Sequence, residues 1–228
     1  VPTGAGLTVV DEVKTNKISP ATGTAFALGD SGDTFTVPSG ATIVNSGTAT
    51  GFGGAWTLIK TKTASDSALI DFVDGASDVV FDGTYKMYCI TAINVEVAND
   101  NVEVWVHTSN DGGSSYETTY DSLDVRGVNW SAVPATYVFT SAIAHVGSVG
   151  NAGGKAFNMT LWLPDPADTS TYHTVYGQGT TLDDGATFRL SAGTGGAHET
   201  AEAFNAIKFS LSAGNIATGT FSLYGIAT

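Results

Sequence analysis

This sequence of 228 residues contains a single cysteine, Cys89, and few basic residues. One cysteine excludes both an intrachain disulfide framework and a zinc site built on cysteines. Only 9 Lys and Arg stand against 22 Asp and Glu, which gives a formal net charge of −13. Because phosphate neutralisation needs clustered cations, we do not expect this chain to bind nucleic acid or to dock on an anionic membrane.

Long apolar runs are also missing. The longest stretch without a charged residue extends from Gly127 to Gly154, and it contains Asn129, Pro134 and His145. A lipid core does not accept such a mixture of polar and turn-forming residues. The sequence therefore predicts no membrane insertion.

Aromatic residues are scarce in the first 54 residues, where only Phe26, Phe35 and Phe52 occur. Short β-prone runs around Phe26, Phe35 and Ile43 are separated by turn signals rich in Gly, Asp and Ser. Strands this short cannot cover their apolar side alone. Residues 1–54 are therefore expected to form an extended β stalk, intertwined in a homotrimer around Phe26, Phe35 and Ile43. A loose linker remains the alternative.

Residues 55–228 show period-two alternation typical of strands, and strands are predicted at 157–163 and 206–212, where the odd positions Phe157 to Leu163 and Ile207 to Leu211 each share one face. Residues 85–97 and 102–106, joined by a turn at 98–101, are expected to pair as a long hairpin, with the odd positions from Tyr85 to Val97 forming the apolar face. One or two helical turns are expected near 198–204. About nine strands with turn-rich connections predict an all-β, antiparallel β-sandwich of jelly-roll type.

Several segments resemble virion proteins of marine tailed bacteriophages. Lys14–Thr24 and Leu28–Ile43 are similar to the repetitive segments near the N-termini of tail-fibre proteins. Four further segments resemble the terminal globular β-domain of the same class: Trp56–Thr61, Ser67–Phe72, Ser212–Thr220 and Leu223–Ile226.

The resemblance implies a homotrimeric virion fibre or spike. Residues 1–54 would join it to other virion proteins of the tail or capsid, and residues 55–228 would meet a host-surface glycan or protein. Two alternatives remain: a capsid decoration or head-fibre protein without receptor binding, and a polysaccharide depolymerase. The resemblance implies no catalytic residues.

Residue patterns typical of enzymes are weak. Gly29-Asp30-Ser31-Gly32 looks like a protease nucleophile loop, but no histidine precedes His107, and the segment is better explained as a turn. The four histidines lack metal-ligand spacing. Acidic turns such as Asn99-Asp100-Asn101 and Asp183-Asp184-Gly185 offer oxygen ligands for Ca²⁺ without EF-hand spacing. We therefore expect no enzyme, metal or cofactor.

Loops gather at the ends of a sandwich, so the receptor-facing loops are expected at the end away from the stalk. Polarity and glycine content select Ser109–Ser115 and Gly193–His198. The candidate receptor-facing residues are Ser109, Asn110, Asp111, Tyr116, Thr194 and His198. The candidates for a sugar-stacking platform are Trp105, Trp130, Trp162, Tyr116, Tyr120, Tyr172 and Tyr176, and the alternative is that these rings fill the second sheet interface. The alternative is that these loops only keep the protein soluble.

Overall fold

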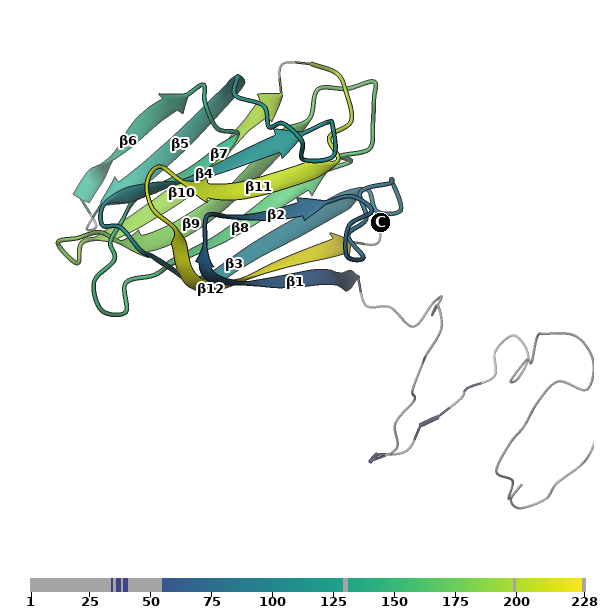
Figure 1. Cartoon of the computed structure of the whole chain (residues 1–228), viewed down its shortest axis with the longest axis horizontal. Helices are drawn as coiled ribbons and strands as arrows, with labels where there is room; N and C mark the ends of the chain where they lie inside the picture. The colour runs from purple at the N-terminus through teal and green to yellow at the C-terminus, as the bar shows by residue number, and fades with distance from the viewer. Residues whose placement is uncertain are drawn as a thin grey trace, which may run out of the picture. The chain divides into compact units, whose positions relative to one another are not determined.

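Twelve antiparallel strands in two sheets form the described part of the chain (Figure 1). The computed structural model describes residues 34, 36–37, 39–40, 55–128, 131–198 and 200–226, and no helix occurs among them. All the strands belong to one unit, residues 50–228. The predicted all-β antiparallel sandwich is confirmed, whereas the stalk candidates Phe26, Phe35 and Ile43 lie outside the described residues.

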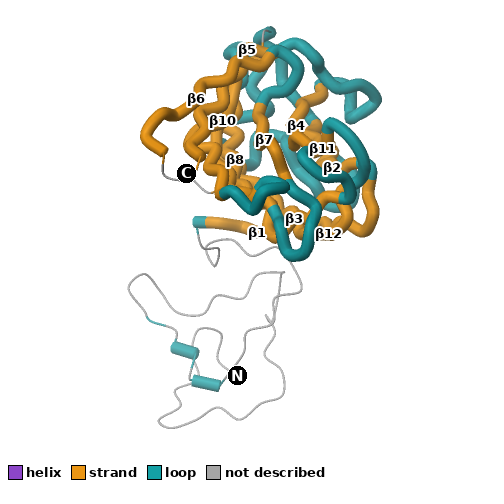
Figure 2. Tube along the Cα trace, turned by 90° about the vertical axis from the view of Figure 1, so that its left-hand side faces the viewer, coloured by secondary structure: helices purple, strands orange, loops and turns teal. Residues whose placement is uncertain are grey.

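The larger sheet has eight strands and the smaller has four (Figures 1 and 2). In spatial order the large sheet contains β1 (Trp56–Ser67), β12 (Ile216–Ile226), β3 (Met87–Val97), β8 (Phe157–Pro164), β9 (Thr174–Leu182), β10 (Phe188–His198), β5 (Tyr120–Val128) and β6 (Ser131–Phe139). The small sheet contains β2 (Leu69–Val73), β11 (Ala206–Leu211), β4 (Val102–Ser109) and β7 (Ala144–Val149).

The core lies between the two sheets and is built by alternation. In β8 the odd positions from Phe157 to Leu163 are buried and the even positions are half-buried, as the sequence predicts. Phe209 of β11 packs on Phe221 of β12 with ring centroids 5.1 Å apart, and both side chains are fully buried. These two rings join the sheets at the centre of the core.

The predicted hairpin between β3 and β4 does not form. β3 pairs with β12 and β8 in the large sheet, whereas β4 pairs with β11 and β7 in the small sheet. The turn at 98–101 carries the chain from one sheet to the other. Alternation shows only that each strand buries one face; here the two apolar faces meet across the core instead of lying side by side.

The predicted apolar face of β3 is also wrong for its first half. Tyr88 and Ile90 face the core, so Met87 and Cys89 point outward. Asn94 adopts a positive φ of 49°, and the register shifts between Ala92 and Val95. This bulge moves the buried set to odd positions, which is why Val95 and Val97 are buried further along the strand.

The helical turns expected at 198–204 are absent. His198 ends β10, and residues 200–205 run irregularly to β11. The backbone N–H groups of Phe204 and Asn205 bond the carbonyls of Pro166 and Ser109, which are distant in the sequence. Tertiary contacts therefore take the hydrogen bonds that a local helix would have used.

Both edges of the large sheet carry residues that discourage further strand pairing. On the edge strand β1, Lys62 reaches Asp71 of β2 at 2.9 Å, and Lys60 lies 3.8 Å from Asp78. The opposite edge strand, β6, contains Pro134, which lacks a backbone N–H. Charges directed inward and proline are common devices for protecting a sheet edge.

Cys89 lies on the outer face of the large sheet but is fully buried. Its register neighbours are Tyr224 and Trp162, and the Trp56 ring lies 5.8 Å and 5.3 Å from the rings of these two residues. Trp56 therefore bridges the two aromatic rings that flank the thiol. Burial raises the pKa of Cys89 to about 11.

We expect Cys89 to resist thiol reagents at neutral pH, because the reactive thiolate is suppressed and the site is covered. Trp56→Ala should increase the labelling rate by about tenfold or more. The rate is measured with a chromogenic disulfide reagent on folded protein. Leu58→Ala, on the same strand, serves as the control, and equal rates in the two variants would show that Trp56 is not the cover.

Candidate functional site

The connections between strands gather at the two ends of the sandwich. At one end, called the loop end from here on, lie the connections 74–86, 110–119, 140–143, 165–173 and 200–205. Trp56, the first residue of β1, pairs with Ile226 at this same end. Each strand runs opposite to the strand before it in the chain. β2 and β4 therefore run towards the end at which β1 begins, and both end there. Ser109–Ser115 therefore lies at the same end of the sandwich as Trp56, the first residue of β1, and not at the opposite end.

The separation is lateral instead. β1 is one edge strand of the large sheet, whereas β5, which the 110–119 connection enters, lies next to the other edge strand. The predicted recognition loop thus stands at the loop end but on the side of the sheet away from β1.

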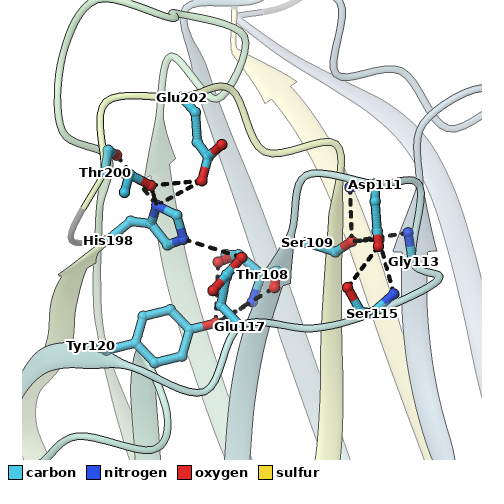
Figure 3. Close-up of polar contacts among 10 residues, drawn as sticks. All are labelled: Thr108, Ser109, Asp111, Gly113, Ser115, Glu117, Tyr120, His198, Thr200 and Glu202. Carbon is cyan, nitrogen blue, oxygen red and sulfur yellow. Dashed lines mark hydrogen bonds and ion pairs between the residues drawn. The ribbon is translucent and has the colours of Figure 1, made fainter.

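Asp111 organises the loop that follows β4 (Figure 3). The Ser109 hydroxyl donates to Asp111 Oδ1 at 2.7 Å, and Ser115 donates its backbone N–H to Oδ1 and its hydroxyl to Oδ2. The Gly113 N–H donates to Ser109 Oγ at 3.0 Å. Hydrogen bonds from Ser115, and then from Ser109, lower the pKa of Asp111 to about 2. The loop therefore holds a carboxylate in a fixed turn.

Asn205 ties this loop to the connection between β10 and β11. Its Oδ1 accepts the Gly112 N–H at 2.8 Å, its Nδ2 donates to the Asn110 carbonyl at 2.9 Å, and its backbone N–H donates to the Ser109 carbonyl at 2.8 Å. Three bonds from one residue fix the shape of the loop.

Asn205→Ala should free the Gly112 N–H and the Asn110 carbonyl and destabilise the fold by about 1 to 2 kcal/mol. Amide hydrogen exchange at Gly112 should accelerate more than exchange in the core strands. Asn215→Ala is the matched control, because Asn215 bonds Asp66 with its side chain at the opposite end. Equal exchange at Gly112 in both variants would contradict the anchoring role.

His198 ends β10 beneath the loop end and is buried (Figure 3). Thr200 Oγ1 lies 3.0 Å from His198 Nδ1 and donates its proton to Glu202 Oε1 at 2.6 Å. Since one hydroxyl has one proton, His198 must donate from Nδ1 to Thr200. Hydrogen bonds from Thr200, and then from Asn110, lower the pKa of Glu202.

Glu117, His198 and Glu202 offer ligand atoms that lie within 4.8 Å of one another. The two glutamates, however, contact different ring nitrogens: Glu117 is 3.9 Å from Nε2, and Glu202 is 3.9 Å from Nδ1. A zinc-type ion bonds one ring nitrogen and needs its ligands on the same side. The arrangement therefore fits a hydrogen-bonded chain better than a metal centre.

The acidic turns considered as calcium ligands use their carboxylates within the protein. Asp100 Oδ1 accepts the Asn151 N–H at 3.1 Å. Asp183 Oδ2 accepts from Arg189 Nε at 2.9 Å. These hydrogen bonds account for the carboxylates of Asp100 and Asp183 without a bound ion.

The structure brings some of the predicted site residues together and separates others. Ser109, Asn110 and Asp111 share one loop whose outer positions are exposed, next to the His198 chain. Residues 193–198 are not a loop but the end of β10. There Thr194 is buried, and its hydroxyl accepts the N–H of His145 at 2.7 Å. Ser109, the last residue of β4, is also buried, so Ser109, Thr194 and His198 are not placed to face a receptor.

The aromatic candidates differ in exposure. Tyr116 is half-buried beneath Lys208, whose Nζ lies 4.2 Å from the ring centroid, so its face is not free for stacking. Trp105 and Trp162 are half-buried, Tyr120 is fully buried, and Trp130 lies outside the described residues. Tyr172, in the 165–173 connection, is 64% exposed and is the most accessible aromatic side chain among the described residues of the loop end.

A second polar cluster lies inside the sandwich. His145 is buried between Asp124 and Glu103, with Nδ1 3.4 Å from Asp124 Oδ2 and Nε2 3.2 Å from Glu103 Oε2. A His–Asp pair occurs in serine hydrolases, but there the imidazole also contacts a nucleophile that is open to substrate. Here Asp124 and His145 are sealed in the interior, so the pair is structural.

No protein-family profile and no curated protein matches this chain. Among solved structures, the crystal structure of the botulinum neurotoxin serotype G binding domain is similar, at 11% identity and a TM-score of 0.20. The match covers 74% of this chain and 43% of that domain. The chain thus spans less than half of that domain, and a likeness this weak assigns neither family nor function. None of the described residues forms a helix long and apolar enough to span a bilayer.

Proposed function

We propose that this chain is a virion structural protein of a tailed bacteriophage, a fibre or spike that attaches the particle to a host-surface glycan or protein. The proposal rests first on the resemblance of Lys14–Ile43 and Ser212–Ile226 to phage fibre proteins. The resemblance implies a globular β-domain, and the antiparallel sandwich of the described residues is compatible with that. Residues 1–54 would form the trimeric stalk and join it to another tail or capsid protein.

The observation that carries the attachment role is the preorganised loop Ser109–Ser115. Asp111 and Asn205 fix its backbone, while residues 110–112 and 114–115 remain exposed. A loop that is ordered before binding loses little conformational entropy on binding. Fixed carboxylate, hydroxyl and amide groups suit a ligand rich in hydroxyl groups, such as a glycan, and Tyr172 adds an exposed ring at the same end.

Many weak sites on one particle act together through effective concentration, so each site need bind only weakly. We expect that replacing Ser109–Ser115 with a Gly-Ser segment of equal length lowers virion adsorption by about tenfold or more. The control is the same replacement at residues 151–154, an exposed turn at the opposite end. Adsorption constants of virions carrying each variant give the comparison.

Unchanged adsorption by virions that carry the folded loop variant would favour the decoration protein instead. The depolymerase alternative predicts a different product. A binding fibre retains host polysaccharide without shortening it, whereas a depolymerase releases new reducing ends. Reducing ends whose release is lost on a single Asp or Glu substitution would overturn the proposal.

A further inference from the structure

The outer face of the large sheet carries most of the exposed apolar surface of the sandwich. Ten large hydrophobic side chains are exposed among the described residues, and seven of them belong to strands of the large sheet and point away from the core. These are Trp56, Leu58, Ile93, Leu123, Val138, Tyr176 and Phe188. Val138 is 75% exposed and Leu58 is 55% exposed. Contiguous apolar surface of this kind marks an interaction site.

The apolar positions are in register across the sheet. One continuous row of paired positions contains Leu58, Tyr224, Cys89, Trp162, Tyr176, Gly195, Leu123 and Val138, one from each of the eight strands. Paired residues on one face of a sheet are direct neighbours. The row is therefore a band that crosses the whole sheet.

On the side of this band that faces away from the loop end, the next two outward rows have no charged side chain, whereas the row on the loop-end side contains the exposed Asp121. The first contains Thr61, Ser222, Thr91, Thr160, Gln178 and Val125. The second contains Thr63, Thr220, Ile93, Asn158, Thr180 and Leu190. Three successive rows thus lack Asp, Glu, Lys and Arg, although the chain has 22 acidic and 9 basic residues.

This absence of charge bears on what can cover the face. Identical chains of net charge −13 repel one another, so they approach best through a surface without charge. A basic partner would instead be steered to the acidic remainder of the surface. Threonine and aliphatic side chains on the outer face of a sheet also suit the packing of one sheet on another.

The area is adequate for an interface. Eight strands at about 4.8 Å spacing and three rows at about 6.7 Å give a face of about 770 Å². A standard specific interface buries about 800 Å² on each partner. The geometry points to the outer face of the large sheet as the surface on which a second copy of this chain packs. This interface supplies contacts between sandwiches that the stalk alone would not.

The same face contains a groove of about 590 Å³ that suits a different occupant, a small ligand. It lies over β5, β9 and β10, between Leu123 and Tyr176, and glycines of β10 form its floor. A neutral glycan could stack on Tyr176 there. The groove covers only three of the eight strands, whereas a second sheet would also cover Leu58, Trp56 and Ile93.

The test uses the full chain with Leu123→Glu and the matched control Leu69→Glu. Leu69 is 40% exposed on β2 of the small sheet, and Leu123 is 45% exposed on the large sheet. We expect Leu123→Glu to weaken self-association about tenfold or more, because the interface would bury an unpaired carboxylate. Light scattering over a range of concentration measures the association, and circular dichroism confirms folding.

Oxidative labelling of Tyr176 keeps the test informative even if the stalk alone holds the chains together. Tyr176 should be protected in the wild type and in Leu69→Glu, and it should become accessible in Leu123→Glu. Equal labelling in all three proteins, or a wild type that stays monomeric, would overturn this interface. Protection that appears only when host polysaccharide is added would assign the groove to a glycan and also overturn it. Neither outcome decides the attachment role, which adsorption measures separately.

Discussion

Phe209→Ala is expected to lower the free energy of unfolding by about 3 to 5 kcal/mol, because it removes a buried ring and leaves a cavity. Phe209 lies in β11 of the small sheet and is fully buried. Its ring contacts Phe221, which in turn packs against Phe157 of β8 with centroids 6.5 Å apart. Removal of the Phe209 ring would therefore weaken the packing of both sheets.

Urea unfolding followed by tryptophan fluorescence measures the change. Phe188→Ala is the control, because Phe188 is 39% exposed on the outer face of β10. We expect the control to lose less than about 1 kcal/mol in the isolated chain. Similar losses in the two variants would contradict the position assigned to Phe209 at the centre of the core.

Acidification between about pH 6.5 and pH 4 is expected to destabilise the fold through His107. The side chain is buried in β4, beside the rings of Trp105 and Tyr120. Burial, and then the Lys208 cation on the neighbouring strand, lower the pKa of His107 to about 4, against about 6.5 in the unfolded chain. The folded state binds the proton more weakly than the unfolded state does.

The direction follows from this difference. Above pH 6.5 both states are neutral at His107, and the fold keeps its full stability. As the pH falls towards 4, the unfolded chain takes up a proton that the folded chain refuses, and stability falls by up to roughly 3 kcal/mol. Carboxylates with lowered pKa, such as Asp111, add their losses below about pH 4.

His107→Gln should flatten this part of the stability curve, because Gln does not titrate. The measurement is the free energy of unfolding at successive pH values for both proteins. His145, His173 and His198 are present in both, so their contributions cancel in the comparison. An unchanged slope between pH 6.5 and pH 4 would contradict the role of His107.

The strand content could be predicted from the sequence, but the pairing of strands could not. Alternation identified β8 and β11 and the face that each buries. It misassigned β3, because Met87, Cys89 and Ile93 make the outer face as apolar as the inner one. Period-two patterns locate a face only when the other face is polar.

Local patterns likewise found part of the site. The turn signals at 109–115 correctly located a turn, since Ser, Asp and Gly form such turns through their own side chains. They missed Asn205, Glu117 and Glu202, whose partners come from other loops. Asn205 acts on residues more than 90 positions away, and no local spacing reports such a contact. Gly193–His198 resembled a loop only because glycines interrupt β10.

The protected edges of the large sheet limit the ways in which copies of the protein can associate. With Lys60 and Lys62 turned inward on β1 and Pro134 in β6, a further copy gains little by adding a strand at either side. Edge addition repeats without limit and leads to fibrils, whereas packing on the outer face of the large sheet stops once that face is covered. A protein built this way can be displayed at high local density and still stop at a small, fixed number of chains.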